Sequence, residues 1–285
     1  MYKGLFVTDL DGTLLTDEKT FNPKDLAALK TLREEGFLVA IATGRSAYSF
    51  NGLIENLEMR GAENRLVVDY VSFSTGAGLM DYADGSLLRS ISLTEDEVCT
   101  IVKYLEASLL DYMIHRAVPE THHFLYRQHG EENPDFLRRL DIYREHATSL
   151  PPGCVNCPGK ATEVLCIVPG DRGDSVAAML QKVFPQFSVI RATSPLDGES
   201  CWIEIFAPAV SKSSSIAWLA EMLGIAKKNI CAVGNDYNDE DLLGWAETSY
   251  LVNNSPARLK NLFPVVTSNN NGGIDEAIGR WLKKI

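Results

Sequence analysis

Short apolar segments alternate with amphipathic helical segments toward both ends of the chain. The apolar segments contain no polar residue, which is typical of strands that are buried on both faces of a sheet. They lie at residues 5–7, 38–42, 230–233 and 265–266. Between the first two, a segment begins at Asn22 and Pro23, repeats leucine every three residues and ends at Gly36, which predicts a capped amphipathic helix. A strand, a helix and a second strand form a βαβ unit, so this pattern predicts a parallel sheet.

The middle of the chain has a different pattern, in which helices are followed by pairs of strands. Residues 94–110, 134–145 and 174–184 have helical patterns. Strand-like segments lie at 113–117, 123–127, 163–168, 187–192 and 201–206. The last two predict a hairpin, and turn residues near position 84 predict another. This alternation predicts an α+β module.

The length of the chain and the change of pattern together predict two domains. A chain of 285 residues can form one large domain or two of moderate size. We therefore expect an α/β fold with a Rossmann-like core formed by residues 1–83 and 207–285. The α+β module, residues 84–206, is expected to be inserted into this core as a cap.

Composition and charge exclude several classes of protein. A hydrophobic content of 45% is ordinary for globular proteins, and no apolar segment is long enough to span a membrane. The N-terminal residues lack the pattern of a signal peptide, so we expect a cytoplasmic protein without a membrane partner. A net charge of −11 and the absence of a Lys/Arg cluster argue against nucleic acid as a partner.

Cysteine and histidine do not predict a metal site in this sequence. A reducing compartment would keep the six cysteines as thiols. Cys154 and Cys157 form a CxxC pair, but a structural zinc site needs four ligands and no second pair exists. His122 and His123 could supply ligands. Because neighbouring residues of a strand point to opposite faces, we expect at most one of them to serve.

Residues that can carry chemistry lie where the predicted strands end. In open parallel sheets the ligand site lies beyond the carboxyl ends of the strands, so residues at these ends are the first candidates. The candidates are Asp9 and Asp11 after the first strand, Thr43 and Gly44 after the second, Lys212 at a predicted helix start, and the loop 234–239 after the third. They therefore predict a single site.

These residue types suit the chemistry of a phosphate monoester. Phosphoryl transfer depends on positioning and on stabilisation of negative charge. The Thr43 hydroxyl and the Gly44 backbone N–H form an anion site, and Lys212 adds a cation. Asp9 is then the candidate nucleophile that forms an aspartyl phosphate. Asp11 is the candidate acid that protonates the leaving alcohol and then activates water.

The paired carboxylates also predict a divalent cation. Two carboxylates about 4 Å apart repel each other by roughly 4 kcal/mol at an effective dielectric constant near 20. The loop 234–239 adds further acidic residues. Carboxylate, amide and carbonyl oxygens are the ligands that suit Mg²⁺, which also binds substrate phosphate. We therefore expect Mg²⁺ as the cofactor.

Four motifs in this order resemble those of the haloacid dehalogenase superfamily, and specifically its Cof-like sugar-phosphate phosphatases with a large inserted cap. The matching segments are DLDGTLL at 9–15, ATGR at 42–45, SKSSSI at 211–216 and GNDYNDEDLL at 234–243. The resemblance covers nearly the whole chain. It implies a Mg²⁺-dependent phosphatase that acts on a small phosphorylated metabolite.

The resemblance also implies roles for individual residues. Asp9 would be the nucleophile and a metal ligand, and Asp11 would be the acid and base and would bind the metal through its carbonyl. Thr43 and Lys212 would bind phosphate, with Asn238 as a supporting group.

The fourth motif departs from the family pattern at one position. Such phosphatases usually have Gly-Asp-x-x-Asn-Asp there, whereas this chain has Asn235 at the first acidic position and Asp236 beside it. An amide oxygen can bind Mg²⁺ but brings no charge. We expect Asn235 to be a direct metal ligand and Asp239 to be a ligand or a supporting partner, and Asp236 is a possible replacement.

Two other functions are compatible with these residues. A phosphomutase would use the same aspartyl phosphate and pass the phosphoryl group to a sugar hydroxyl instead of water. A binding protein for phosphorylated ligands that has weakened catalysis is the second alternative, which the Asn235 departure supports. Arg45 could contact substrate or pair with a nearby acid. The sequence predicts no oligomeric state.

Overall fold

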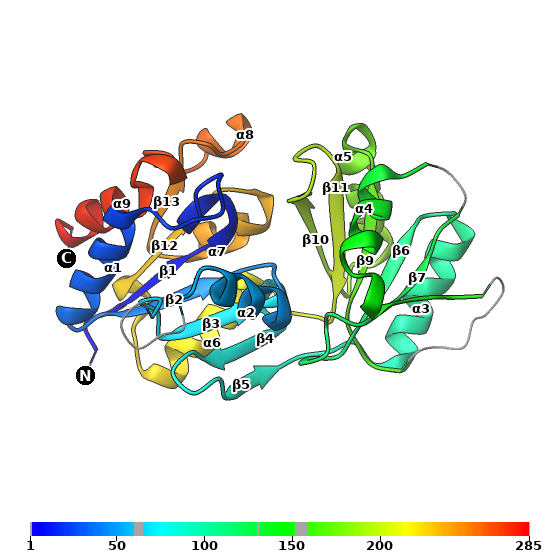
Figure 1. Cartoon of the computed structure of the whole chain (residues 1–285), viewed down its shortest axis with the longest axis horizontal. Coiled ribbons are helices and arrows are strands. Elements are labelled where there is room, and N and C mark those ends of the chain that lie inside the picture. Colours follow the sequence, from blue (N-terminus) through cyan, green and yellow to red (C-terminus); the bar gives the residue numbers. More distant parts are fainter. Residues whose placement is uncertain (1, 60–64, 130–131, 152–158, 285) are drawn as a thin grey trace. The chain divides into compact units, whose positions relative to one another are not determined.

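The chain folds into two compact units. The computed structural model describes residues 2–59, 65–129, 132–151 and 159–284. The first unit, the core, consists of Met1–Arg45, Ser49–Arg89 and Ser211–Ile285. The second unit, the cap, consists of Ser46–Tyr48 and Ser90–Val210. Figure 1 shows the elements of each unit.

The core is built on an eight-stranded sheet with the order β14-β13-β12-β1-β2-β3-β4-β5. The strands are β1 (Leu5–Thr8), β2 (Leu38–Ala42), β3 (Tyr70–Phe73), β4 (Gly78–Asp81), β5 (Leu87–Ser90), β12 (Ile230–Gly234), β13 (Thr248–Val252) and β14 (Val265–Val266). Neighbouring strands from β14 to β3 are parallel, and β4 pairs with β3 in the antiparallel direction. The four strands predicted from apolar segments are therefore confirmed.

Helices cover both faces of the core sheet. The core sequence supplies α1 (Pro23–Glu34), α2 (Ala47–Asn56), α6 (Lys212–Leu223), α7 (Glu240–Trp245), α8 (Ala257–Lys260) and α9 (Gly273–Leu282). Leu5 and Val7 pack in one hydrophobic cluster with residues of α6 and α7, whereas the ring of Phe6 lies 6.1 Å from that of Trp281 in α9. Because successive strand residues point to opposite faces, α6 and α7 cover one face and α9, with α1 beside it (Figure 1), covers the other.

The predicted helix after the first strand is α1, and its ends follow from the sequence. The Asn22 side chain accepts a hydrogen bond from the Lys24 N–H at 3.0 Å, and Pro23 occupies the first helical position. Gly36 follows the helix with a φ of 91°, a conformation that favours glycine.

The cap has a six-stranded sheet with the order β10-β11-β9-β6-β7-β8. Its strands are β6 (Tyr112–Arg116), β7 (Phe124–Arg127), β8 (Ala147–Ser149), β9 (Ala161–Val168), β10 (Ser188–Thr193) and β11 (Cys201–Phe206). Its helices are α3 (Glu95–Ala107), α4 (Pro134–Ile142) and α5 (Gly170–Val183). The strands pair in the antiparallel direction except for β7 and β8, which are parallel. The predicted fold class, an α/β core with an inserted α+β module, is confirmed.

Short turns of helix complete the two units. They are η1 (Leu10–Leu14), η2 (Ser74–Gly76), η3 (Arg144–His146), η4 (Lys227–Asn229), η5 (Tyr237–Asp239) and η6 (Asn269–Asn271). None of the described helices has the length and apolar character needed to span a bilayer.

The structure differs from the sequence analysis at the start of the cap and at one cysteine. Strand β5 lies in the core sheet, so the long segment of the cap begins at residue 90 instead of 84. This segment ends at residue 210 instead of 206, and the cap also includes Ser46–Tyr48. Cys99 is disulfide-bonded, so the expectation that every cysteine is a thiol is wrong for this residue. The CxxC pair, Cys154 and Cys157, lies outside the described residues.

Gly76 lets two segments of the core approach each other closely. Its φ is 99°, and a Cβ at this position would lie 2.2 Å from the backbone oxygen of Ser211. Ser211 caps α6, which begins at Lys212. The absence of a side chain at Gly76 is therefore required for η2 to pack against the start of this helix.

We predict that Gly76→Ala lowers the free energy of unfolding by at least about 2 kcal/mol, because the new methyl group overlaps backbone and the residue must adopt a left-handed conformation. Urea unfolding measures this change. The matched control is Gly279→Ala in α9, where a Cβ would meet no atom within 4 Å, and which should gain about 0.5–1 kcal/mol. Equal stabilities of the two variants would contradict this account.

Candidate active site

The candidate site lies at the carboxyl end of the parallel strands of the core. Asp9 directly follows β1, and its backbone N–H donates to the Val233 carbonyl of β12 at 2.9 Å. This pairing places Asp9 beside the loop that follows β12. The chain then turns at Gly12, where φ is 74° and a Cβ would lie 2.6 Å from Nδ2 of Asn235. The first and fourth motifs are thus in contact.

A buried lysine connects two aspartates from these motifs. The Lys212 ammonium donates to Oδ1 of Asp9 at 2.7 Å and to Oδ1 of Asp239 at 2.6 Å. The side chains of Lys212 and Asp239 are fully buried, and Asp9 is 5% exposed. Lys212 is held at the first position of α6, where the Ser211 hydroxyl accepts a hydrogen bond from the Ser214 N–H. The third motif therefore supplies the cation of this cluster.

Burial and charge act in opposite directions on the ionisation of this cluster. Burial raises the pKa of Asp9 to about 7, with Lys212 opposing this shift and the Asp239 charge adding to it. For Lys212, burial favours the neutral amine, but the charges of Asp239 and Asp9 outweigh it and raise the pKa above its ordinary value. Lys212 is therefore charged at neutral pH, and Asp9 is close to its titration point.

Asp239 organises the loop after β12 through both of its oxygens. While Oδ1 accepts from Lys212, Oδ2 accepts from the backbone N–H groups of Asn235 at 2.8 Å and Asp236 at 3.1 Å. Gly234 allows this arrangement, because a Cβ there would lie 2.6 Å from the Asp239 side chain. Oδ1 of Asn235 in turn accepts from the Thr13 hydroxyl at 3.1 Å. The Asp239 carboxylate thereby fixes the position of Asn235.

The second motif lies beside the fourth motif in the core. Thr43 follows β2, its N–H donates to the Ser72 carbonyl at 2.8 Å, and its hydroxyl accepts from the Arg45 N–H at 3.1 Å. A Cβ at Gly44 would lie 3.8 Å from Nδ2 of Asn238. The candidate phosphate-binding residues of these two motifs are therefore neighbours.

Asp11 is paired with two cations. Arg45 donates to it from Nε at 2.6 Å and from Nη2 at 2.7 Å, and Lys19 donates from Nζ at 3.1 Å. Burial alone would raise the pKa of Asp11, but the hydrogen bonds and charges of Arg45 and then Lys19 hold it below its ordinary value. Of the two alternatives for Arg45, pairing with a nearby acid is the one observed. Asp11 is thus held ionised.

Three residues near these motifs were not among the sequence candidates. Lys19 pairs with Asp11, Thr13 donates to Asn235, and Nδ2 of Asn254 donates to the Gly12 carbonyl at 2.7 Å. Asn254 follows β13, so the rule that led to Asp9 and Thr43 would also have indicated it, had the strand at 248–252 been identified. Nothing in the sequence pattern marks Lys19.

Comparison with known proteins identifies the class to which this fold and site belong. Residues 6–278 match the model of a family described as haloacid dehalogenase-like hydrolase. The chain belongs to this family. The match confirms the resemblance noted in the sequence and the predicted enzyme class, a hydrolase of the haloacid dehalogenase type.

Individual relatives agree with this assignment. The chain is 25% identical to the 5-amino-6-(5-phospho-D-ribitylamino)uracil phosphatase of Bacillus subtilis, over 98% of this chain and 96% of the relative. It is 26% identical to the HMP-PP phosphatase of Serratia proteamaculans, over 93% and 88%. A solved phosphatase of the same superfamily from Bacteroides thetaiotaomicron shares the fold with a TM-score of 0.74, at 16% identity over 98% and 94%.

The raised pKa of Asp9 predicts how stability depends on pH. Because the folded-state pKa, about 7, exceeds the ordinary value of 3.8, ionised Asp9 destabilises the fold, and this loss grows as pH rises from about 4 to about 7. Near pH 8 in EDTA, the free energy of unfolding of Asp9→Asn, measured by urea unfolding, should therefore exceed that of the unmodified protein by about 1–3 kcal/mol. Near pH 4.5 the two proteins should differ little.

A control for this prediction is Asp17→Asn. Hydrogen bonds from Asn269 and then Asn270 lower the pKa of Asp17, so its ionised form is favoured in the folded state. Relative to the unmodified protein, that variant should become less stable as pH rises through the acid range, because it lacks the carboxylate whose ionisation stabilises the fold. An Asp9→Asn protein that is less stable than the unmodified protein near pH 8 would show that burial does not destabilise the ionised form of Asp9.

Proposed function

We propose that this protein is a Mg²⁺-dependent phosphatase that hydrolyses a small phosphate monoester, such as a sugar phosphate or a related metabolite, through an aspartyl phosphate. The observation that carries this proposal is the buried contact between Asp9 and Lys212, beside the loop that begins at Asn235. It provides one carboxylate next to a permanent positive charge. Two curated relatives named as phosphatases, one of them for a phosphorylated ribityl compound, support the reaction class.

In this mechanism Asp9 is the nucleophile and attacks phosphorus. The Thr43 hydroxyl, the Gly44 N–H, Lys212 and the Asn238 amide would donate to the oxygens of the phosphoryl group, which carry the negative charge of the transition state. The phosphoryl group passes to the carboxylate oxygen, and the bond to the leaving alcohol breaks.

Asp11 would act on both proton transfers, as the acid toward the leaving alcohol and then as the base toward water. An acid must carry a proton, and the ion pairs with Arg45 and Lys19 oppose protonation. We propose that a bound phosphate monoester draws Arg45 away from Asp11, which would raise the pKa of Asp11 when the proton is needed. In the second step the ionised form of Asp11 is the one that accepts a proton from water.

The residues of the site fit Mg²⁺. Burial and the Asp239 charge raise the pKa of Asp9 even though Lys212 opposes them, so a further positive charge would stabilise the ionised carboxylate. The Asp9 carboxylate, the Asp11 carbonyl and the Asn235 amide oxygen are hard ligands that would hold the ion. When bound, Mg²⁺ would neutralise charge on the phosphate and favour the ionised nucleophile.

Asp239 and Asp236 have other roles in this proposal. Both oxygens of Asp239 already accept hydrogen bonds from protein donors, so Asp239 is better placed to orient Lys212 and the loop than to bind the metal directly. The Asp236 backbone N–H is held by the same carboxylate. Among the described residues, the Asn235 amide oxygen accepts a single hydrogen bond, from the Thr13 hydroxyl, and keeps a second lone pair for a metal ion, so we retain Asn235 as the ligand from this loop.

We predict that Asp9→Asn lowers the kcat for p-nitrophenyl phosphate with Mg²⁺ by at least about 1000-fold, because the amide cannot form the phosphoenzyme. The control is Asp84→Asn, in the turn before β5, which should keep full activity. Turnover by Asp9→Asn within about 10-fold of the unmodified enzyme would refute this nucleophile assignment. Solvent ¹⁸O appearing in released phosphate separates hydrolysis from the phosphomutase reaction.

We also predict that Asn235→Asp tightens Mg²⁺ binding by about 10-fold, because the new ligand adds a charge that the amide lacks. The concentration of Mg²⁺ that gives half-maximal turnover, together with calorimetric titration, measures this change. Asn261→Asp, at the exposed end of α8, adds the same charge away from the site and should leave Mg²⁺ affinity unchanged. Unchanged affinity in Asn235→Asp would exclude Asn235 as a ligand.

A further inference from the structure

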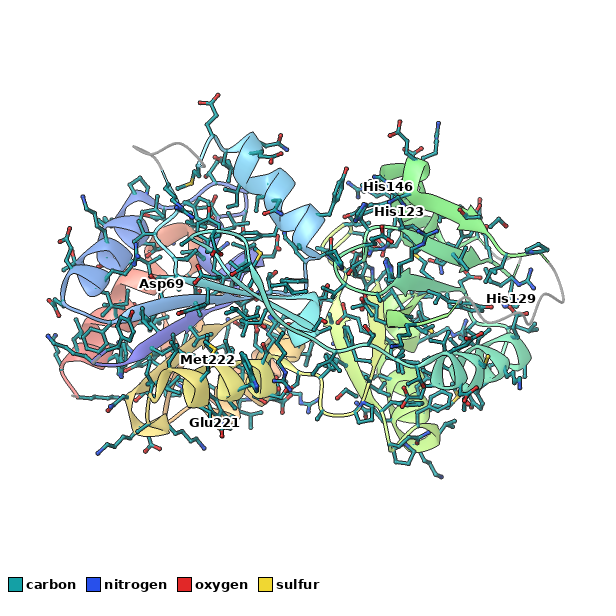
Figure 2. All side chains as sticks on the ribbon, turned by 90° about the horizontal axis from the view of Figure 1, so that it is seen from below. Asp69, His123, His129, His146, Glu221 and Met222 are labelled. Carbon is teal, nitrogen blue, oxygen red and sulfur yellow. The ribbon has the colours of Figure 1, made fainter. Side chains whose placement is uncertain are left out.

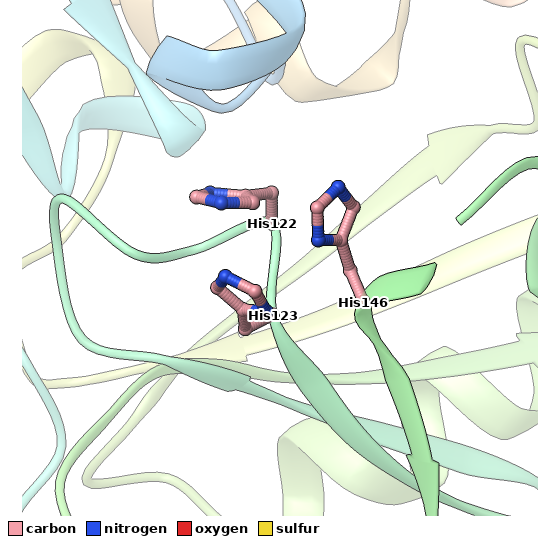
Figure 3. Close-up of side chains that lie close together, drawn as sticks. All are labelled: His122, His123 and His146. Atoms are coloured by element: carbon pink, nitrogen blue, oxygen red, sulfur yellow. The ribbon is translucent and has the colours of Figure 1, made fainter. Parts of the chain in front are cut away.

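Three histidines of the cap lie together at the edge of its sheet. His123 directly precedes β7, and His146, the last residue of η3, directly precedes β8. These strands are parallel and pair Phe124 with Ala147, so the register places His123 and His146 side by side. Figure 3 shows both rings next to His122, and ring centroids are 4.2, 4.7 and 4.8 Å apart. One nitrogen of each ring lies within 4.8 Å of the other two.

The sequence analysis expected at most one of His122 and His123 to serve as a ligand, and the geometry differs. That expectation assumed that both residues lie on a strand, where neighbours point to opposite faces. They lie instead in the turn before β7, which is closed by the His123 N–H donating to the Glu120 carbonyl at 2.9 Å. In this turn both rings lie on the same side of the chain (Figure 3).

Two of the three rings have a nitrogen that no group of the described residues contacts by a hydrogen bond. All three are partly buried. An imidazole nitrogen with a free lone pair is the atom that binds a metal ion. Among the described residues, no hydrogen-bond partner exists for Nδ1 of His122 or for Nδ1 of His146, and both atoms are shielded from solvent.

The distances are within reach of a common ion. A tetrahedral zinc with bonds of 2.0–2.1 Å to imidazole holds its nitrogens about 3.4 Å apart. The nitrogens here lie within 4.8 Å of one another, so binding one ion would require the side chains to rotate toward each other, with His122 leaving its stacked contact on Tyr48 or Tyr48 moving with it. Three imidazoles favour Zn²⁺, Ni²⁺ or Cu²⁺ over Mg²⁺, which prefers oxygen ligands. The fourth position would be left to water.

We propose that His122, His123 and His146 form a binding site for a divalent first-row transition metal ion, with Zn²⁺ as the physiological candidate. The bound ion ties the turn before β7 to the start of β8, the short strand at the edge of the cap sheet. This site is independent of the proposed phosphatase reaction, because its ligands are nitrogens of the cap and those of the Mg²⁺ site are oxygens of the core.

The test is a zinc titration of the full-length, tag-free protein carrying Asp9→Asn, in excess Mg²⁺, with a chromophoric chelator as competitor. The substitution Asp9→Asn weakens Zn²⁺ binding at the core site, and the excess Mg²⁺ competes with Zn²⁺ for that site. We expect one equivalent of Zn²⁺ to bind, and we expect His122→Gln and His146→Gln each to weaken binding by at least about 10-fold.

The matched control is His129→Gln. His129 is a partly buried histidine of the same unit, but it lies next to Glu106 at 3.9 Å and away from His123 and His146 (Figure 2). Zinc affinity in this variant should equal that of the parent. A parent that binds no zinc, or His122→Gln and His146→Gln variants that bind zinc as tightly as the parent, would overturn the proposal.

A spectroscopic measurement keeps the proposal testable should a variant fail to fold. NMR of the parent protein with ¹⁵N-labelled histidine reports which rings bind zinc. The ring signals of His122, His123 and His146 should shift together at one equivalent of Zn²⁺, and those of His115 and His129 should not. Shifts at His129, or at fewer than three rings of the cluster, would contradict a three-histidine site.

Discussion

The ion pair network of Lys212 with Asp9 and Asp239 is the interaction on which the rest of the core site depends. All three side chains are buried, and a buried charge is tolerated only when it is paired. The network joins the end of β1, the start of α6 and the loop after β12. Asp9 and Lys212 are 203 residues apart in the sequence. Each partner keeps another in place, so the positions of Asp9, Lys212 and the loop after β12 are set together.

The charges of this network do not balance. One ammonium group serves two carboxylates, and burial still raises the pKa of Asp9 to about 7. Asn235, in the loop held by Asp239, adds no further charge to the network. Asp11 has the opposite environment, because Arg45 and Lys19 hold it ionised. The neighbours of the two aspartates therefore shift their pKa values in opposite directions.

The two units of the chain offer different kinds of metal-ligating atoms. The core offers carboxylate, carbonyl and amide oxygens, which suit Mg²⁺ and a phosphate ligand. The cap offers three imidazoles, which suit transition metal ions such as Zn²⁺. Mg²⁺ prefers oxygen ligands and would not compete well for these nitrogens. Separate ligand types would allow both sites to be filled in one molecule without competition.

The sequence by itself determined the parallel sheet of the core, the α+β character of the cap and the motif residues of the site. It did so because buried strands and capped helices leave local patterns, and because the carboxyl ends of parallel strands meet at one edge. It did not show that Arg45 and Lys19 neutralise Asp11, that Asp239 uses both oxygens within the protein, or that His146 joins His122 and His123. Only the tertiary structure decided these contacts. They depend on the register of strands from distant parts of the chain and on the geometry of turns, and no local pattern of residues specifies either.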